Sequence, residues 1–454
     1  MTRIDAREVA LECYHAAVRG ADPERITGEA VAGLDLQSRR AWILALGKGS
    51  VAMARGAREA LIERGVEVAG GLIVPQAPPQ QPVPGLELTC GDHPVPGDGS
   101  LRAAARLGEI AATIPDDDDV LVLVSGGTTS LIAAPIGGVK PEDLRALFDA
   151  LLGSGADIVV MNALRKRVLR WGAGRLAAAL DGRPVHCLIA SDVPADSPAS
   201  VGSGPCSPDP MTATELLRLV TVAGLETALP PAVAQYLERV ASGERSETPK
   251  PGAPCFARVS VEVILDLRRA VTAAAEQARA LGAAPVLRGR TPLTGDAATA
   301  GAGIALFVAG WRDAFARESL GTSGFAVAVF AGETTVRLPA GSTGRGGRCQ
   351  ELALACARAL HTLGPDGAGI TVLAAGTDGR DGPTDAAGAI VDSTTWTAIA
   401  AAGVDPAAAL EGHDAYPALD RVGALLRTGP TGTNVNDIVI AIVTGGPPRV
   451  TDHS

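Results

Sequence analysis

Aromatic residues are scarce in this chain, at 3% of its 454 residues. Proteins that bind single-stranded nucleic acid stack the bases on aromatic side chains, so this scarcity argues against such a binder. The net charge of −10 also disfavours a partner with a phosphate backbone. A small anionic substrate is compatible with this charge, provided that its site is locally basic. The composition therefore predicts no nucleic-acid partner.

Cysteine pairs and long apolar runs are absent as well. The seven cysteines are scattered without a C-x-x-C pair, which argues against a zinc knuckle or a disulfide framework and favours buried free thiols. No uninterrupted apolar run reaches about 18 residues, and the N-terminal segment is typical of an amphipathic helix rather than a signal peptide. We therefore expect a cytoplasmic protein without a membrane partner. The oligomeric state stays open, with a homodimer as one alternative.

What the chain does contain is an alternation of short aliphatic runs and helical stretches. Apolar runs of this length between helices predict a mostly parallel sheet covered on both faces. In the first half, strands are predicted at 42–46, 71–74, 120–124 and 185–190, and helices near 51–64, 99–113, 141–152 and 162–180.

A second α/β series is predicted in the other half, and a chain of 454 residues is expected to form two domains. The polar stretch at 242–254, rich in Pro and Gly, is the predicted linker. Beyond it, helices are predicted at 267–281 and 297–316, and strands near 325–330, 334–338, 371–375 and 438–443.

Glycine-rich loops that directly follow strands are the candidate sites, because ligands gather at the carboxyl ends of parallel strands. Gly47 and Lys48 lie between a predicted strand and a helix, where backbone N–H groups and a lysine favour an anion. A solvent-facing lysine in a tight turn is the alternative. The loop at 125–129 also follows a strand, and its glycines and hydroxyls favour close approach to a phosphate. Its members are Ser125, Gly126, Gly127, Thr128 and Thr129.

Charged residues mark three further loops. Asp192 follows the strand at 185–190 and suits magnesium or a hydroxyl proton, with an Asx-turn or helix cap as an equal alternative. Arg345 and Arg348 lie at the start of a predicted helix, where the helix dipole disfavours cations. An external anion at these arginines is therefore predicted. Asp378 lies in an acidic loop whose spacing differs from calcium loops, so magnesium or substrate hydroxyls are the interpretations.

Neutral polar groups gather in one last loop, where Thr433, Asn434 and Asn436 suit a hydroxylated ligand. Two other signals are set aside. His93 lies in a turn-rich segment, and a structural turn is favoured over a role in a site. The stretch at 172–177 fits G-x-G-x-x-A but follows a basic helical stretch rather than a strand, which argues against a nicotinamide site there.

Together these loops resemble those of the glycerate 2-kinases, two-part enzymes that end in a MOFRL-type domain and are often mislabelled hydroxypyruvate reductases. The matching motifs run in the family's order from about residue 5 to residue 445. They are G-K-G-S, G-D-H-P-V-P, S-G-G-T-T-S, N-A-L-R-K, S-D-V-P, G-G-R-C-Q-E, G-T-D-G-R-D-G-P-T-D-A-A-G-A-I-V-D and T-G-P-T-G-T-N-V-N-D.

The resemblance implies a two-domain α/β fold with the active site in the cleft between the domains. The expected N-terminal domain, at 1–245, has a Rossmann-like, doubly wound, mostly parallel sheet. The expected C-terminal α/β domain, at 246–454, contains the MOFRL-type region at about 320–445.

The resemblance also implies an ATP-dependent kinase that converts D-glycerate to 2-phosphoglycerate with Mg²⁺. Its partners would then be a small anionic hydroxy acid and a nucleotide. Lys48 and Arg348 match the family's active-site lysine and arginine, and Asp192 is a third catalytic candidate. Asp192 and Asp378 are the magnesium candidates, and the acceptor carboxylate or a phosphate is assigned to Arg165 and Lys166.

Several positions depart from the family's pattern. The segment at 165–173 and the SGGTT loop differ from it, and Cys349 replaces an asparagine. These changes keep a basic site but remove specific hydroxyl, amide and imidazole groups. Three alternatives therefore stay open: a kinase of another small hydroxy or sugar acid, a hydroxypyruvate reductase, or a catalytically silent ligand-binding homologue.

Overall fold

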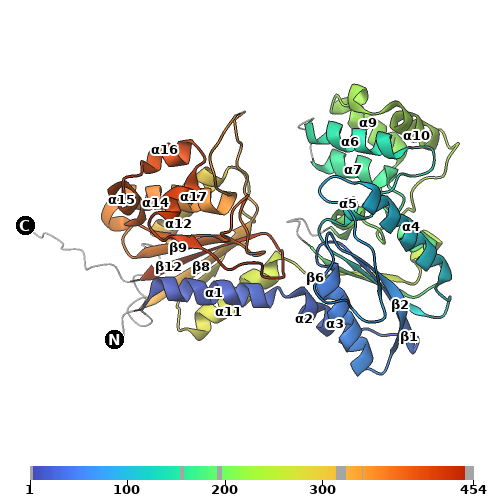
Figure 1. The fold of residues 1–454 in the computed structure, drawn as a ribbon, viewed down its shortest axis with the longest axis horizontal. Coiled ribbons are helices and arrows are strands. Elements are labelled where there is room, and N and C mark those ends of the chain that lie inside the picture. The colour runs from blue at the N-terminus through green and yellow to red at the C-terminus, as the bar shows by residue number, and fades with distance from the viewer. Residues whose placement is uncertain (1–3, 154–157, 192–196, 313–323, 340, 445–454) are drawn as a thin grey trace, which may run out of the picture. The chain divides into compact units, whose positions relative to one another are not determined.

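Two compact units make up the computed structural model, which describes residues 4–153, 158–191, 197–312, 324–339 and 341–444 (Figure 1). One unit is the continuous segment Pro23–Leu265. The other joins Met1–Asp22 to Asp266–Ser454. Each unit has its own six-stranded sheet and its own apolar core, so each is described separately.

A parallel sheet forms the centre of the unit Pro23–Leu265. Its strands are β1 (Arg40–Leu46), β2 (Glu67–Val74), β3 (Glu87–Leu88), β4 (Asp119–Val124), β5 (Val185–Ala190) and β6 (Val259–Leu265). Their order is β3-β2-β1-β4-β5-β6, and all neighbours pair in parallel. Strand β4 is buried along its whole length, as expected for a sheet covered on both faces. The predicted doubly wound parallel sheet is confirmed.

The helices of this unit form two groups. Those that follow the strands cover the sheet, whereas α6, α7, α9 and α10 gather apart from it around a second core (Figure 1). The α-helices are α2 (Pro23–Ala32), α3 (Ser50–Glu63), α4 (Asp98–Thr113), α5 (Thr128–Leu131), α6 (Pro141–Gly153), α7 (Ile158–Val168), α8 (Arg175–Ala179), α9 (Ala213–Val222) and α10 (Pro231–Ala241). Short 3₁₀ turns are η1 (Pro198–Ser203), η2 (Glu226–Ala228) and η3 (Pro254–Phe256).

The other unit has a mixed sheet of order β11-β10-β9-β12-β8-β7, in which only β7 and β8 pair in parallel. The strands are β7 (Val286–Arg288), β8 (Phe325–Gly332), β9 (Ile370–Gly376), β10 (Gly388–Asp392), β11 (Leu425–Leu426) and β12 (Asp437–Thr444). Helices α1 and α11 cover one face, and α12 and α14 cover the other (Figure 1). The helices are α1 (Ala6–Gly20), α11 (Leu267–Ala280), α12 (Ala297–Trp311), α14 (Arg348–Thr362), η5 (Gly364–Asp366), α15 (Thr395–Ala401), α16 (Pro406–Glu411) and α17 (Ala415–Asp420).

The first unit begins and ends later in the chain than the predicted first domain, because it spans Pro23–Leu265 instead of 1–245. Helix α1 packs against α11, β9 and β12, so the N-terminal segment belongs with the C-terminal half. Strand β6 pairs with β5 and completes the first sheet. The chain then passes between units at Asp266, whose side chain accepts the N–H groups of Arg268 and Arg269 and starts α11.

Three local predictions are wrong. The stretch 242–254 is no linker, because it lies inside the first unit, where its Glu247 and Thr248 make polar contacts. The helix predicted at 162–180 is divided into α7 and α8 by a turn in which Gly174 takes a φ of +79°. The strand predicted at 334–338 is reduced to an isolated bridge between Thr335 and Asp296.

Candidate active site

The switch point of the first sheet lies between β1 and β4. The chain proceeds from β1 to β2 on one side, and β4 adds to β1 on the other side. The loops at the carboxyl ends of β1 and β4 therefore diverge, which is where open parallel sheets bind ligands. These are the loops of Lys48 and of 125–127, so the structure brings together two sites that the sequence singled out separately.

Hydrogen bonds fix these two loops against each other. The N–H of Lys48 donates to the carbonyl of Gly126 (2.9 Å), and the N–H of Gly49 donates to Oγ of Ser125 (3.0 Å). Gly47 has a φ of +112°, and a Cβ atom there would lie 2.3 Å from Oγ of Ser125. Only glycine fits this close approach.

The start of helix α3 adds a place for an anion. Its N-cap is Gly49, and neither a side-chain cap nor an acidic residue serves the first turn. The first N–H groups of a helix lack partners within the helix and carry partial positive charge. The exposed Lys48 adds a full charge beside them, so this edge of the sheet suits a phosphate group.

The hydroxyls of the second loop have separate roles. The Ser125 side chain is buried and donates to the carbonyl of Leu46 (3.2 Å). Thr128 is also buried, and its hydroxyl donates to the carbonyl of Ser125 (2.7 Å). Thr129 is half-buried and shares a hydrogen bond with Oγ of Ser203 (3.0 Å). Ser125 and Thr128 therefore hold the loop, while Gly126, Gly127 and Thr129 keep partial access to solvent.

His93 also reaches this place, although the sequence favoured a structural turn for it. A Cβ atom on Gly127 would lie 3.2 Å from Cδ2 of His93 and 3.2 Å from Cγ of Lys48. Burial, and then the charge of Lys48, hold the pKa of His93 below its ordinary value. The G-D-H-P-V-P match was the available signal, but nothing local in that turn indicated a neighbour 45 residues back in the chain.

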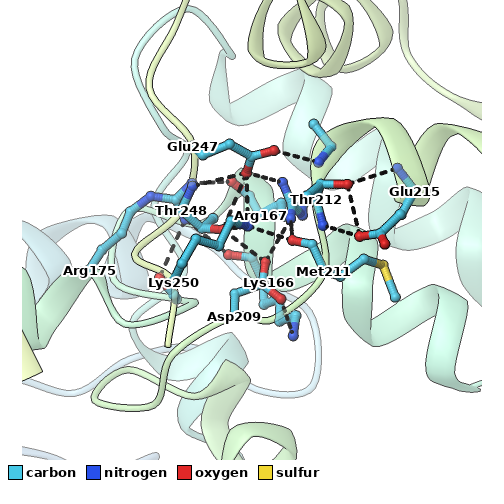
Figure 2. A network of polar contacts seen from close by, with 12 residues as sticks. Lys166, Arg167, Arg175, Asp209, Met211, Thr212, Glu215, Glu247, Thr248 and Lys250 are labelled. Atoms are coloured by element: carbon cyan, nitrogen blue, oxygen red, sulfur yellow. Dashed lines mark hydrogen bonds and ion pairs between the residues drawn. The ribbon is translucent and has the colours of Figure 1, made fainter. Parts of the chain in front are cut away.

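Lys166 forms an ion pair inside its own unit. Figure 2 shows it in a polar network with Arg167, Asp209 and Glu247. Its Nζ lies 2.8 Å from Oδ1 of the fully buried Asp209, and Nη2 of Arg167 lies 2.9 Å from Oδ2 of the same carboxylate. Burial by itself would raise the pKa of Asp209, but Lys166 and Arg167 lower it. The positive charge of Lys166 is therefore balanced by this carboxylate.

The same network holds the segment that was predicted to be a linker. The Glu247 carboxylate accepts the N–H of Ala213 (2.6 Å) and a guanidinium N–H of Arg167 (2.9 Å) (Figure 2). Burial alone would raise the pKa of Glu247, but these donors and Lys250 lower it to about 2.

Arg165 lies outside this network. Its guanidinium lies over the ring of Phe148, 5.0 Å from the centroid. Its Nε atom is buried without a hydrogen-bond partner among the residues that the structure describes. Burial lowers the pKa of Arg165. The two predicted acceptor-binding cations thus differ, since among the described residues Lys166 is paired with a carboxylate and Arg165 is not.

In the other unit, Arg348 begins helix α14 and pairs with two carboxylates of its own chain. Its Nε and Nη2 donate to the Asp437 carboxylate (2.5 and 3.1 Å), and its Nη1 donates to Glu333 (2.7 Å). Burial alone would lower the pKa of Arg348, but Asp437 raises it. The charge of Arg348 is therefore compensated within its own unit, and its place at the helix start does not by itself indicate an external anion.

The α14 N-terminus is capped by Asp381, which the sequence did not single out. Its carboxylate accepts the N–H groups of Cys349 (3.1 Å) and Gln350 (2.8 Å). Burial raises the pKa of Asp381 to about 7 against the lowering effect of these bonds. Arg345 lies before the helix, where its N–H donates to Asp414 (2.7 Å) and its guanidinium lies 4.8 Å from the centroid of the Tyr416 ring.

The polar side chains of the two remaining loops make hydrogen bonds within their own unit. One carboxylate oxygen of Asp378 accepts the N–H of Arg380 (2.9 Å). The Thr433 hydroxyl donates to the carbonyl of Ala21, and the side chain of the exposed Asn434 accepts the N–H of Asn436 (3.1 Å).

Over the described residues, no group of three or more His, Cys, Asp or Glu side chains could hold a metal ion. Asp192, the other magnesium candidate, lies outside the described residues. None of the described helices is long and apolar enough to cross a membrane.

Comparisons with known proteins agree with the motif order. The model of the family "Domain of unknown function (DUF4147)" matches residues 9–238, and that of the MOFRL family matches residues 326–437. A glycerate 2-kinase of Pyrococcus horikoshii is 35% identical, over 98% of this chain and 99% of its own. A protein of Agrobacterium vitis, described as a proposed hydroxypyruvate reductase, is 36% identical over 96% of this chain and 94% of its own. The crystal structure of a glycerate kinase from Thermotoga maritima matches with a TM-score of 0.84 and 33% identity, over 96% of this chain and 99% of its own.

Proposed function

Because this chain belongs to the glycerate 2-kinase family, we propose that it transfers the γ-phosphoryl group of ATP to the 2-hydroxyl of D-glycerate. The products are ADP and 2-phosphoglycerate. The observation that carries the proposal is the convergence of Lys48, the glycine-rich loop at 125–127 and the uncapped start of α3 at the switch point of a parallel sheet.

Phosphoryl transfer depends mainly on positioning and charge stabilisation, and this edge of the sheet offers both. We assign Lys48 to the transferring phosphoryl group. The backbone of Gly126 and Gly127 keeps partial access to solvent and allows phosphate oxygens to approach closely, and Thr129 offers a hydroxyl. The buried Gly47 lets the two loops pack together. Arg348 is assigned a role in the same transfer by its match to the family motif. Its bonds to Asp437 and Glu333 support a fixed orientation of the guanidinium.

Magnesium would enter bound to the phosphates of ATP, where it neutralises charge. We propose Asp192 and Asp378 as residues that assist its binding. Asp192→Asn and Asp378→Asn would each raise the Mg²⁺ concentration needed for half-maximal rate. A Mg²⁺ dependence equal to that of the unchanged protein would remove the residue from this role.

The test of the reaction itself uses purified protein with ATP, Mg²⁺ and D-glycerate. Phosphorus NMR should identify 2-phosphoglycerate, formed in step with ADP, and hydroxypyruvate should cause no oxidation of NADH. Robust NADH oxidation, with no ADP formed from any hydroxy acid, would show a reductase instead. Calorimetric binding of ATP and D-glycerate without product would show a silent binding protein.

A different small hydroxy acid is the second candidate acceptor, and one observation favours it. Lys166, assigned above to the acceptor carboxylate or a phosphate, is paired with the buried Asp209. A site that lacks a partner for a substrate group discriminates weakly for that group. A screen of hydroxy acids with three to six carbons decides the matter, because the highest kcat/KM for D-glycerate would eliminate this candidate.

A further inference from the structure

The backbone on both sides of His93 is tied to neighbouring helices. The N–H of Asp92 donates to Oγ of Ser100 (2.9 Å), and the Asp92 carboxylate accepts the N–H of Ser100 (3.1 Å). On the other side, the hydroxyl of Ser130 donates to the carbonyl of Pro94 (2.9 Å). His93 is therefore presented from a fixed loop.

The imidazole of His93 shares one surface with Lys48. Both side chains approach the position of a Cβ atom on Gly127, at 3.2 Å in each case. The ring is half-buried, and neither ring nitrogen has a hydrogen-bond partner within the described part of the chain. An imidazole carried by this held backbone beside the proposed phosphoryl-binding lysine, and without a hydrogen-bond partner of its own among the described residues, is suited to a substrate.

We propose that His93 accepts the proton of the acceptor hydroxyl during phosphoryl transfer. This inference rests on the proposed function. As the hydroxyl oxygen bonds to the γ-phosphorus, its O–H bond breaks and the proton moves to the free imidazole nitrogen. The bond from phosphorus to the bridging oxygen breaks, and ADP leaves with that electron pair. The imidazole then returns its proton to solvent.

The surroundings of His93 favour the neutral ring that this step needs. Lys48 is the charged group that faces it from the loop after β1, and α5 contributes only Thr128, Thr129, Ser130 and Leu131. The carboxylate of Asp92 is directed to Ser100. Burial and Lys48 both lower the pKa of His93, so the ring is free to accept a proton at neutral pH.

The experiment measures kcat/KM against pH for the unchanged protein, His93→Gln and the control His361→Gln, an exposed histidine of α14. In the unchanged protein, the rate should fall at acid pH with an apparent pKa below about 6.5. His93→Gln should lower kcat by roughly 10²–10⁴ and remove that pH dependence, with the KM for ATP unchanged. His361→Gln should keep both the rate and the pH profile.

A second measurement uses the unchanged protein alone. Histidine-labelled protein should show, among its six imidazoles, one that titrates with the pKa of the acid limb and shifts when D-glycerate is added. Retention of the acid limb in folded His93→Gln overturns the inference, as does the absence of such an imidazole. If the unchanged protein forms no ADP from any hydroxy acid, the proposed function itself fails, and that result is visible before any variant is made.

Discussion

Lys48 and Arg348 have the same charge but very different surroundings. Lys48 is exposed, and no ion pair engages it within the described residues. Arg348 is bound by the carboxylates of Asp437 and Glu333. A ligand can therefore bind the charge of Lys48 without breaking an ion pair of the protein. Arg348, in contrast, also contributes to the stability of its unit.

Lys48→Ala should lower kcat by roughly 10²–10⁴, the range found when a preorganised charge donor is removed. The melting temperature should stay unchanged, because the side chain is exposed. Lys140→Ala, which removes an exposed lysine of the same unit, is the matched control and should change neither quantity. Steady-state kinetics and thermal melts measure both effects. Near-normal kcat in folded Lys48→Ala would remove this lysine from the mechanism.

Arg348→Ala should lower both kcat and stability. The helix dipole alone predicts that removing this cation leaves stability unchanged or raises it. The structure reverses the sign, because the change leaves the buried Asp437 without its donor, at a cost of about 2 kcal/mol. Adding Asp437→Asn to the variant should restore part of the loss. Arg380→Ala, an exposed arginine, is the control, and equal unfolding free energies for both single variants would contradict the prediction.

Helix α14 shows how an element can depend on a group far away in sequence. Its first turn is capped by the carboxylate of Asp381, 32 residues beyond Cys349. A Cβ atom on Gly347 would lie 2.2 Å from Oδ1 of Asp381, so glycine lets this cap approach. The start of the helix is therefore set by a loop from between β9 and β10.

Asp381 should make the stability of this unit depend on pH. Its pKa rises from an ordinary 3.8 to about 7 on folding, so the folded state binds the proton more tightly. The resulting stabilisation is fully present below pH 3.8 and is lost as pH rises toward about 7.

Asp381→Asn removes the titrating carboxyl, so the difference in unfolding free energy between the variant and the unchanged protein reports the contribution of Asp381. From pH 4 to pH 8, the unfolding free energy of the unchanged protein should fall relative to that of the variant by about 2–4 kcal/mol. Asp405→Asn is the control, because it alters an exposed aspartate that also caps a helix by accepting two backbone N–H groups, here through one carboxylate oxygen. Denaturant titrations at several pH values give these differences, and a constant difference would contradict the raised pKa.

At the level of the whole molecule, α1 completes the C-terminal unit from the other end of the chain. Tyr14 of α1 is fully buried, and its hydroxyl donates to the carbonyl of Gly376 (2.9 Å). Burial raises the pKa of Tyr14 to about 12, which keeps that donor protonated. The C-terminal half alone lacks this helix and exposes part of its sheet.

The fragment 23–265 should therefore unfold cooperatively by itself, whereas the fragment 246–454 should not. The first retains a complete sheet, while the second loses the packing of α1 and carries a segment that belongs to the other unit. Circular dichroism melts of both fragments test this. Linking residues 4–22 to 266–454 should restore a cooperative transition, and a cooperative melt of 246–454 without α1 would contradict the role of that helix.

The sequence by itself determined the strands and helices whose buried residues recur regularly along the chain. The apolar runs of β1, β4 and β5 were predicted because a strand covered on both faces needs side chains that are apolar throughout. The loops after β1 and β4 could be found for the same reason, since such loops mark the ligand edge of a parallel sheet. The family followed from the order of the motifs.

Only the tertiary structure decided which charges face each other. Lys166 meets Asp209 across 43 residues, Arg348 meets Asp437 across 89, and His93 meets Lys48 across 45. Hydrophobic periodicity reports the burial of each residue along its own element, and it carries no information on the partner that a distant loop supplies. An arginine that looked available for a ligand was thus already paired, and a histidine that looked structural came to lie beside the lysine of the proposed site.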